Sequence, residues 1–388
     1  MKLAKLSLAA IAVVGLSTSS FAADTLADAF KNGKVSGAIQ GYYWQQDSGT
    51  ADADIFTSGL DLSFQTDTFN GFAFKATFQG SASPFIDEDA KTGGANFAGD
   101  MWGSGAQLSE AYISYAMGKT TALVGRMYLS TPLVAGSGSR VNKEAFEGVA
   151  VINTDLPNTT LIAGYVQKMQ SRTDGDGNFG EFTKTFKTTI GDVAVEDGAY
   201  TVAVINNSIK DVTLTAAYAD VKDIVDVAYA EAAYTTSAFG VAGQYYYSEV
   251  EGADDTNLLG VKADATFGAA NVYAAYSKTD DAADVVAGLG NGADLAFTGS
   301  PFNSNSYAAD TEAYKVGASY AVMANANVGL NYTVNKVDVA DSEVSYLAIE
   351  ADYAFEGALK GLSVYLGYED QGKDSDDSEL RFNANYKF

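Results

Sequence analysis

The feature that most constrains this chain is a regular two-residue alternation of apolar and polar side chains. In the final segment, SELRFNANYKF (378–388), the even positions from Leu380 to Phe388 are apolar and the odd positions from Arg381 to Lys387 are polar. Successive side chains of a β-strand leave opposite faces of the backbone, so this alternation predicts a strand with one apolar face. Either the core of a β-sandwich or membrane lipid could cover that face.

Eighteen segments with this alternation follow one another along the chain. Most of them are nine to thirteen residues long, which suits tilted strands that cross a bilayer. The 24 tyrosines, 21 phenylalanines and 39 glycines, with four prolines, are typical of a β-rich protein. The predicted strands span residues 34–46, 53–66, 71–81, 106–117, 120–128, 146–155, 158–168, 198–206, 210–219, 223–234, 238–249, 256–267, 270–278, 312–321, 325–336, 343–355, 360–370 and 378–388.

Short and long connections alternate between these strands, except for one short link near 220–222. A meander of this kind places all tight turns at one rim, as in outer-membrane barrels with short periplasmic turns and long extracellular loops. A sandwich shows no such regularity. We therefore predict an all-β, transmembrane antiparallel β-barrel of about 18 strands, in which the last strand pairs with the first. The longest connections are 82–105, 129–145, 169–197 and 279–311.

The N-terminus has the pattern of a secretory signal. Lys2 and Lys5 precede an apolar run at 6–16, and small residues follow up to Ala22. The run is shorter than the roughly 20 residues of a membrane anchor, so we expect a cleaved signal peptide at 1–22. A short periplasmic segment (23–33) and the barrel (34–388) then make up the mature protein.

The composition excludes several classes of function. The chain has no cysteine and no histidine, which excludes disulfides, histidine-activated nucleophiles and histidine metal ligands. A formal net charge of −25 disfavours a nucleic-acid partner. An acid pair such as Glu350 and Asp352 could serve a barrel enzyme, but two inward positions on one strand are more simply lumen wall. We expect no enzymatic activity.

A barrel of this width encloses an aqueous channel, and its selectivity depends on a constriction. The connection 129–145 (LSTPLVAGSGSRVNKEA) combines flexible glycines and serines with charges of both signs. Opposed charges across a pore orient dipolar solutes. A plain surface loop is the alternative. The predicted constriction residues are Arg126, Arg140, Lys143, Glu144 and Glu147.

The alternation also predicts which charged residues line the lumen. Acids and bases nearly balance there, so the negative net charge lies mostly in loops such as 85–91, 251–255, 278–284 and 373–379. An acidic vestibule attracts cations over about 8 Å, the Debye length in physiological salt, so we expect cation preference, unless these loops only aid solubility. The predicted lumen-facing residues are Asp61, Lys75, Glu110, Lys262, Asp264, Lys315, Glu350, Asp352, Glu369 and Arg381.

One loop partly matches a calcium motif. DGDGNFGEFTKT places Asp174, Asp176 and Asn178 at the first three ligand positions of an EF-hand, but Phe179 replaces the required glycine and Thr185 the bidentate glutamate. The motif therefore fails. Weak calcium binding by the external acidic loops, or calcium bridges from them to lipopolysaccharide phosphates, remains open.

Several stretches carry a resemblance to a known family. They are LADAFKNGKVSGAIQGYYW at the first strand, LVGRMYLSTPLVAGSGSR around the predicted inward loop, VAVINNSIKDVTLTAAYADV (202–221) and LRFNANYKF at the end. With them the chain resembles the major outer-membrane porins of epsilonproteobacteria (Campylobacter-type), which are similar in fold to OprD-like channels. That resemblance implies an eighteen-stranded, usually trimeric, cation-preferring porin.

The same resemblance implies a calcium ion at the constriction in some members, for which Glu110, Glu144 and Glu147 are candidate ligands. OprD-like relatives favour carboxylate-bearing solutes along a ladder of basic residues. This sequence departs from that pattern, because it has four arginines: Arg126, Arg140, Arg172 and Arg381.

These observations predict a passive outer-membrane porin for ions and small hydrophilic solutes. Phe388 on the lipid face resembles the signal recognised by the barrel insertion machinery. The expected partners are outer-membrane lipid, lipopolysaccharide and further copies in a homotrimer. The aromatic clusters YYW (42–44) and YYY (245–247) fit interfacial girdles. The alternatives are an adhesive barrel whose loops 169–197 and 279–311 bind surfaces, or an OprD-like substrate-selective channel.

Overall fold

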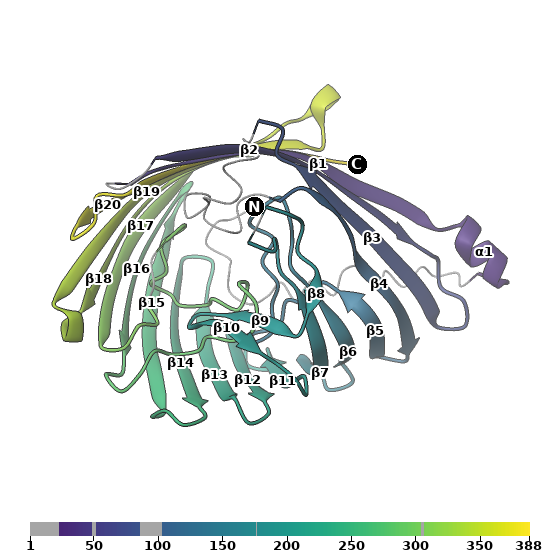
Figure 1. The fold of residues 1–388 in the computed structure, drawn as a ribbon, viewed down its shortest axis with the longest axis horizontal. Coiled ribbons are helices and arrows are strands. Elements are labelled where there is room, and N and C mark those ends of the chain that lie inside the picture. Colours follow the sequence, from purple (N-terminus) through teal and green to yellow (C-terminus); the bar gives the residue numbers. More distant parts are fainter. Residues whose placement is uncertain (1–22, 49–51, 86–102, 176, 304–305) are drawn as a thin grey trace.

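The computed structural model describes residues 23–48, 52–85, 103–175, 177–303 and 306–388 (Figure 1). The predicted signal peptide (1–22) lies outside the described residues. The wall consists of eighteen strands: β1 (Lys34–Asp47), β2 (Ala53–Gln65), β3 (Phe72–Ala82), β4 (Gly105–Met117), β5 (Thr120–Met127), β6 (Ala145–Asn153), β7 (Thr159–Gln170), β11 (Ala199–Asn206), β12 (Val212–Val221), β13 (Val225–Thr235), β14 (Phe239–Val250), β15 (Thr256–Phe267), β16 (Ala270–Thr279), β17 (Thr311–Met323), β18 (Ala326–Val337), β19 (Ser342–Ala354), β20 (Leu362–Lys373) and β21 (Ser378–Lys387).

Each wall strand is antiparallel to its neighbours, and the sheet closes on itself. β21 pairs with β1, with Tyr386 opposite Ile39 and Arg381 opposite Trp44. β7 pairs directly with β11, so the short strands β8 (Phe182–Thr183), β9 (Thr185–Thr188) and β10 (Gly191–Ala194) lie outside the closed ring. The predicted closed barrel of eighteen antiparallel strands is confirmed.

The two rims of the barrel differ as the connection lengths predict. The short-turn rim carries α1 (Leu26–Lys31), which Thr25 caps by accepting a hydrogen bond from Asp28 N. The helix lies beside the turn after β2, because Asp67 N donates to Ala29 O over 3.0 Å. α1 has six residues, and no helix in the described ranges is long and apolar enough to cross a membrane.

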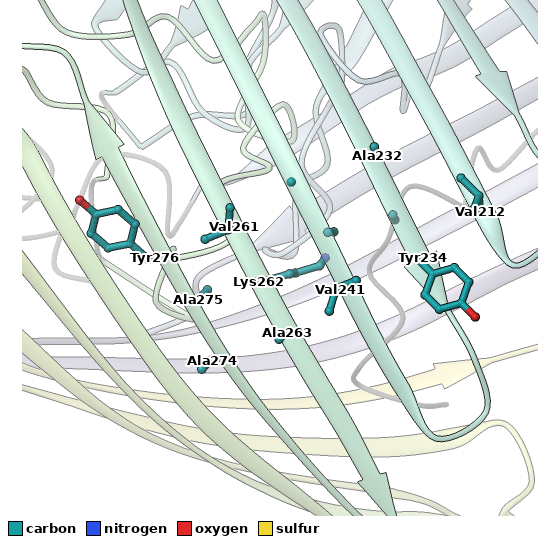
Figure 2. Close-up of a pocket in the computed structure, with 13 residues that line it drawn as sticks. Val212, Ala232, Tyr234, Val241, Val261, Lys262, Ala263, Ala274, Ala275 and Tyr276 are labelled. Atoms are coloured by element: carbon teal, nitrogen blue, oxygen red, sulfur yellow. The ribbon is translucent and has the colours of Figure 1, made fainter.

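Apolar side chains cover the outside of the wall. In β2, Phe56, Leu60 and Leu62 are 38–43 % exposed, whereas Thr57 and Asp61 on the other face are buried. An outward shallow recess of about 650 Å³ lies over β13–β16, where Tyr234, Val241, Val261 and Tyr276 surround small alanines (Figure 2). This exterior is suited to contact with hydrocarbon, and closure of the sheet pairs the backbone groups that lipid would leave unsatisfied.

Two predicted girdle clusters need correction, because alternation turns every second aromatic ring inward. Tyr42 and Trp44 are 2 % and 1 % exposed and pack with Ile55 and Val141 inside the barrel. Tyr246 is likewise buried, while its neighbour Tyr245 faces out.

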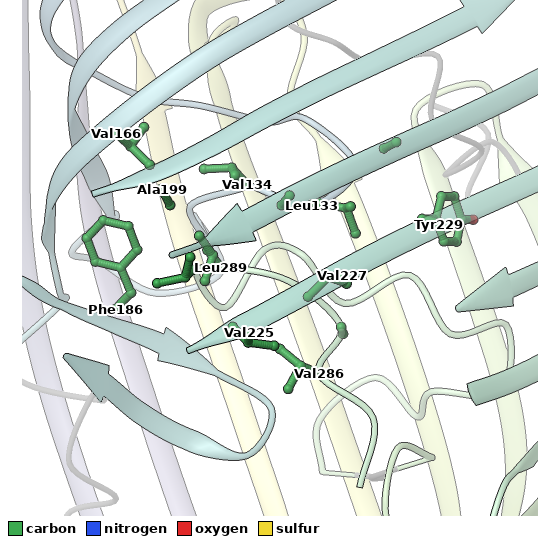
Figure 3. Close-up of a cluster of buried hydrophobic side chains, with 14 of the residues drawn as sticks. Leu133, Val134, Val166, Phe186, Ala199, Val225, Val227, Tyr229, Val286 and Leu289 are labelled. Atoms are coloured by element: carbon green, nitrogen blue, oxygen red, sulfur yellow. The ribbon is translucent and has the colours of Figure 1, made fainter. Parts of the chain in front are cut away.

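The buried apolar core lies within the barrel, on its long-loop side. It joins three connections that we name the throat loop (128–144), the hairpin loop (171–198, which contains β8–β10) and the cover loop (280–310). In Figure 3, Leu133 and Val134 of the throat loop lie among Phe186, Leu289 and the wall residues. These loops position the charged residues described next. Wall positions in this core include Val166, Ala199, Val225, Val227 and Tyr229.

Candidate functional site

The throat loop folds into the barrel and pairs with the cover loop. Ala135 N donates to Leu289 O over 3.0 Å, and Leu289 N donates to Leu133 O over 2.8 Å. The hairpin loop joins them, because Gly290 N donates to Lys187 O over 2.7 Å. The three loops therefore form one hydrogen-bonded assembly that narrows the lumen.

Polar residues of β2 and β3 hold the tip of the throat loop. Lys143 forms an ion pair with Asp61, and its backbone N–H donates to Gln79 Oε1 over 2.8 Å. Gly59 leaves room for the loop, since a Cβ at this position would lie 2.2 Å from Val141 Cγ1. A small residue at position 59 thus permits the close approach of loop and wall.

Glu144 links the throat loop to the cover loop. Its carboxylate accepts hydrogen bonds from Ser137 N (2.9 Å), Asn291 N (3.0 Å) and Asn291 Nδ2 (2.5 Å). Burial raises the pKa of Glu144, while these hydrogen bonds and nearby Lys187 partly offset that rise. The residue predicted at the constriction therefore acts as a joint between two loops.

Three of the four arginines converge inside the barrel near Tyr42. Arg140 comes from the throat loop, Arg172 from the hairpin loop and Arg381 from β21, and each is at most 9 % exposed. Burial lowers the pKa of both Arg140 and Arg172 to about 10, and the positive charge of Arg381 contributes to each shift. We name Arg140, Arg172 and Arg381 the arginine cluster.

Acidic residues of β20 and β21 balance part of this charge and hold the cover loop. Arg381 Nε donates to Glu379, whose carboxylate also accepts from Trp44 Nε1 over 2.6 Å. Asn303 Nδ2 donates to Glu369 (3.1 Å) and to Glu379 (2.9 Å). Thus the predicted lumen residues Glu369 and Arg381 lie at the contact between wall and cover loop.

Lys75 and Glu110 neutralise each other on the inner wall. Lys75 Nζ lies 2.8 Å from Glu110 Oε2, and Thr77 Oγ1 donates to the same carboxylate over 2.5 Å. Both charged residues are nearly inaccessible, with 7 % and 2 % exposure. This pair is a structural part of the wall beneath the throat loop.

The predicted lumen lysines and carboxylates of β15, β17 and β19 differ in their surroundings. The cover loop lies over the lysines, with Lys262 Nζ 4.1 Å from the centre of the Phe297 ring and Lys315 donating to Gly299 O. Glu350 instead accepts from Tyr365 Oη (2.8 Å) and from Asn331 Nδ2 (3.0 Å). Asp352 accepts from Asn327 Nδ2 (3.0 Å), and Asp264 is half-buried. Neutral donors thus hold the carboxylates of Glu350 and Asp352 on the inner wall.

All ten residues predicted to face the lumen lie on the inward face of their strands. The expectation for Arg126 and Glu147 must be corrected. They lie directly opposite each other, on the same outward face as the exposed Val124 and Val149. The inward positions beside them are Met127 and Phe146, which are 1 % and 0 % exposed, because successive side chains of a strand leave opposite faces.

The predicted calcium ligands do not come together. Glu147 faces outward, Glu110 pairs with Lys75, and Glu144 binds Asn291. Asp176 lies outside the described residues, and Asp174 accepts hydrogen bonds from Asn178. Within the described part of the chain, no group of three acidic side chains has metal-binding geometry.

The comparisons with known proteins agree with this geometry. The family model described as "outer membrane porin, OprD family" matches residues 103–388. The chain belongs to the OprD family. A comparison with curated protein sequences gives no match. Membership makes this OprD-family chain an outer-membrane porin, in agreement with its apolar exterior and inward loops.

Solved structures from Acinetobacter baumannii and Pseudomonas aeruginosa have the same fold. Acinetobacter baumannii OccAB3 is 16 % identical, with a TM-score of 0.79 and coverage of 92 % of this chain and 99 % of that one. Pseudomonas aeruginosa OccK9 (OpdG) is 14 % identical, with a TM-score of 0.80 and coverage of 93 % and 99 %. Pseudomonas aeruginosa OpdK, solved with vanillate, is 16 % identical, with a TM-score of 0.77 and coverage of 92 % and 99 %. At these identities the likeness shows the fold.

Sequence reasoning missed two parts of this site. The sequence gives no reason to place Arg172 in the site, because it lies in a loop without strand alternation. The cover loop was expected to be extracellular, and its buried run from Val285 to Leu289 is the signal for an inward position. The segment VVAGL (285–289) has four apolar residues, one glycine and no polar side chain, which suits a segment covered on all sides.

Proposed function

We propose that this OprD-family porin is a passive channel for ions and small hydrophilic solutes, with a preference for cations. The long-loop rim then faces outside and the short-turn rim faces the periplasm. The observation that carries this proposal is the interlocked assembly of three loops inside a closed barrel, which brings buried charges to the narrowed lumen. Loops that fold inward in this way leave less surface for adhesion, so the adhesive alternative has less support.

The proposed cation preference rests on the inner-wall carboxylates that neutral donors hold, notably Glu350 and Asp352. Planar-bilayer recordings across a tenfold KCl gradient test it directly. We expect stepwise ohmic openings and a reversal potential displaced toward that of potassium. Well-folded protein without openings would contradict the channel, whereas openings with a reversal potential displaced toward chloride would contradict only the cation preference.

The arginine cluster supports a second candidate, a channel that selects carboxylate-bearing solutes. Vanillate, present in the OpdK structure, is such a solute, and guanidinium groups bind carboxylates through paired hydrogen bonds. Vanillate added to one side should cause brief current blocks, and its neutral amide should cause fewer. Equal blocking by both compounds would contradict this candidate. The variant R140Q/R172Q should abolish the difference between them.

The remaining features of the proposal concern maturation and assembly. We propose a membrane-embedded homotrimer of the epsilonproteobacterial porin type, exported through cleavage after Ala22. Phe388, whose backbone is bonded to Gly37 O, serves as the insertion signal in this proposal. Native mass spectrometry of the purified protein tests both the trimer mass and the mature N-terminus. The same measurement in millimolar CaCl₂ tests calcium binding, because each bound ion adds its mass to the protein.

A further inference from the structure

Arg126, Glu147 and Lys168 form a charged cluster on the outward face of the wall. The strand register sets Arg126 of β5 opposite Glu147 of β6, and Glu147 opposite Lys168 of β7. Residues that oppose each other in an antiparallel pair share a face of the sheet. We name these three residues, with the neighbouring Phe182 of β8, the outer basic cluster; β5, β6, β7 and β8 are adjacent in Figure 1.

The outer basic cluster is held in a defined geometry. Arg126 Nε donates to Glu147 Oε2 over 3.0 Å and Nη1 donates to Leu108 O over 3.3 Å. The guanidinium carbon lies 4.2 Å from the centre of the Phe182 ring. Lys168 Nζ lies 3.7 Å from Glu147 Oε1. One carboxylate thus fixes two cations, both of which remain about one-third exposed.

The charge of this cluster differs from its surroundings at the same rim. Two cations share one carboxylate, which leaves a net charge of about +1 at neutral pH. At another place on this rim the balance is reversed, since Lys278 lies near both Asp310 and Glu312. The outer basic cluster is therefore a local excess of positive charge in a chain whose formal net charge is −25.

The height of the cluster on the wall corresponds to the membrane interface. Toward the short-turn rim its neighbours on the outward face are the exposed Val124 and Val149. On β7 and β11 the rings of Tyr165 and Tyr200, 4.9 Å apart, occupy the outward face toward the long-loop rim. Tyrosines of this kind mark the level of lipid headgroups. Lys168 follows Tyr165 toward the loops, at headgroup level.

We infer that the outer basic cluster binds a phosphate group carried by an anionic glycolipid of the outer leaflet. The N–H groups of Arg126 and Lys168 that do not contact Glu147 or Leu108 O provide the donors for phosphate oxygens. The adjoining valines provide apolar wall for the acyl chains of the same molecule, which favours a lipid-borne phosphate over a dissolved one. The inference uses the orientation proposed above, but not the proposed solute selectivity.

Native mass spectrometry of the full-length protein in detergent tests this site. The probe is bis-phosphorylated lipid A, and the variant is R126Q/K168Q. The matched control is K119Q/K210Q, which removes two exposed lysines from the short-turn rim. We expect R126Q/K168Q to bind lipid A about tenfold more weakly than wild type, as expected for loss of charge-assisted contacts. The control K119Q/K210Q should bind lipid A as tightly as wild type does. Dephosphorylated lipid A should bind equally to wild type and to both variants.

Three outcomes would overturn the inference. They are undiminished lipid A binding by R126Q/K168Q, equal loss in K119Q/K210Q, or competition by millimolar inorganic phosphate, which would indicate a site for dissolved anions. Single-channel conductance serves as the folding check, because the outer basic cluster faces away from the lumen. If both variants have the wild-type conductance, a loss of lipid A binding is a binding defect and not misfolding. The conductance can be measured whatever the solute selectivity of the channel.

Discussion

Glu144 of the throat loop and Asn291 of the cover loop are joined by two hydrogen bonds, one from the backbone N–H and one from the side-chain amide of Asn291. The residues are 147 positions apart in the chain. Their contact therefore fixes two independent loops relative to each other inside the barrel. The geometry of the narrowed lumen depends on this joint more directly than on the wall strands.

Substitution of Glu144 by alanine should loosen the joint. The variant loses hydrogen bonds to a charged acceptor, each worth about 1.5–3 kcal/mol. We expect larger and noisier single-channel currents, with an unchanged melting temperature of the barrel wall. N291A should reproduce much of the effect, and the double variant E144A/N291A should add little to E144A. Additive effects of the two substitutions would show that the residues act separately.

The joint between throat loop and cover loop should also depend on pH. Burial raises the pKa of Glu144 above its ordinary 4.5. An acid with a raised pKa in the folded state stabilises that state below its unfolded pKa, and this stabilisation is lost as pH rises through the folded pKa. We expect quieter currents at pH 4.5 than at pH 7. The side chain in the Glu144→Gln variant is neutral at every pH, so the current noise of that channel should not change between pH 4.5 and pH 7. An equal pH response in that variant would assign the effect to another group.

Removing one partner of the Lys75–Glu110 pair should destabilise the barrel. In K75M the Glu110 carboxylate stays buried without its cation, at a cost of about 3–5 kcal/mol. The variant K75M/E110Q removes both charges and should recover most of the lost stability. Thermal unfolding in detergent, followed by loss of heat-modifiable migration, measures the difference. A double variant less stable than K75M would contradict this account.

Neutralising Glu350 and Asp352 together should reduce cation preference. These carboxylates lie on the inner wall and are held by neutral donors, so E350Q/D352N preserves shape while it removes two negative charges. We expect the reversal potential in a KCl gradient to move toward zero. D254N/D255N in the exposed 251–255 connection is the matched control. A larger shift in the control would assign selectivity to the acidic loops.

A side chain at position 59 should displace the throat loop. In G59V the new Cβ would occupy space now filled by Val141, with 2.2 Å between that Cβ and Val141 Cγ1. We expect a higher conductance and a loss of the Lys143–Asp61 ion pair. Gly243→Val provides the control, because a Cβ there has its closest neighbour at 3.9 Å. Unchanged conductance in G59V would show that the loop adapts without moving.

The sequence predicts the wall well because lipid and water impose the alternation on every strand. Each of the eighteen predicted segments corresponds to one wall strand, usually within a few residues. The same alternation, applied through the loop-proximal ends of β5 and β6, would have placed Arg126 and Glu147 outside. Their closeness in sequence to the throat loop suggests the constriction instead, but closeness in sequence says nothing about the face on which a side chain lies.

The arginine cluster could not be predicted from the sequence, for a different reason. Arg140, Arg172 and Arg381 come from two loops and one strand, and loop positions have no periodicity that reports their direction. Their meeting depends on hydrogen bonds such as that from Asn142 Nδ2 to Arg172 O, between residues 30 positions apart. Long-range contacts of this kind become visible only once the closed wall brings the loops together.

The interlock of the throat, hairpin and cover loops has a consequence for evolution of the cell surface. Antibodies and bacteriophages select for change in exposed loops, yet change in these three loops would also alter permeability. Short connections such as 251–255, 338–341 and 374–377 lie outside the buried core that joins these loops, so we expect changes there to leave permeability unaltered.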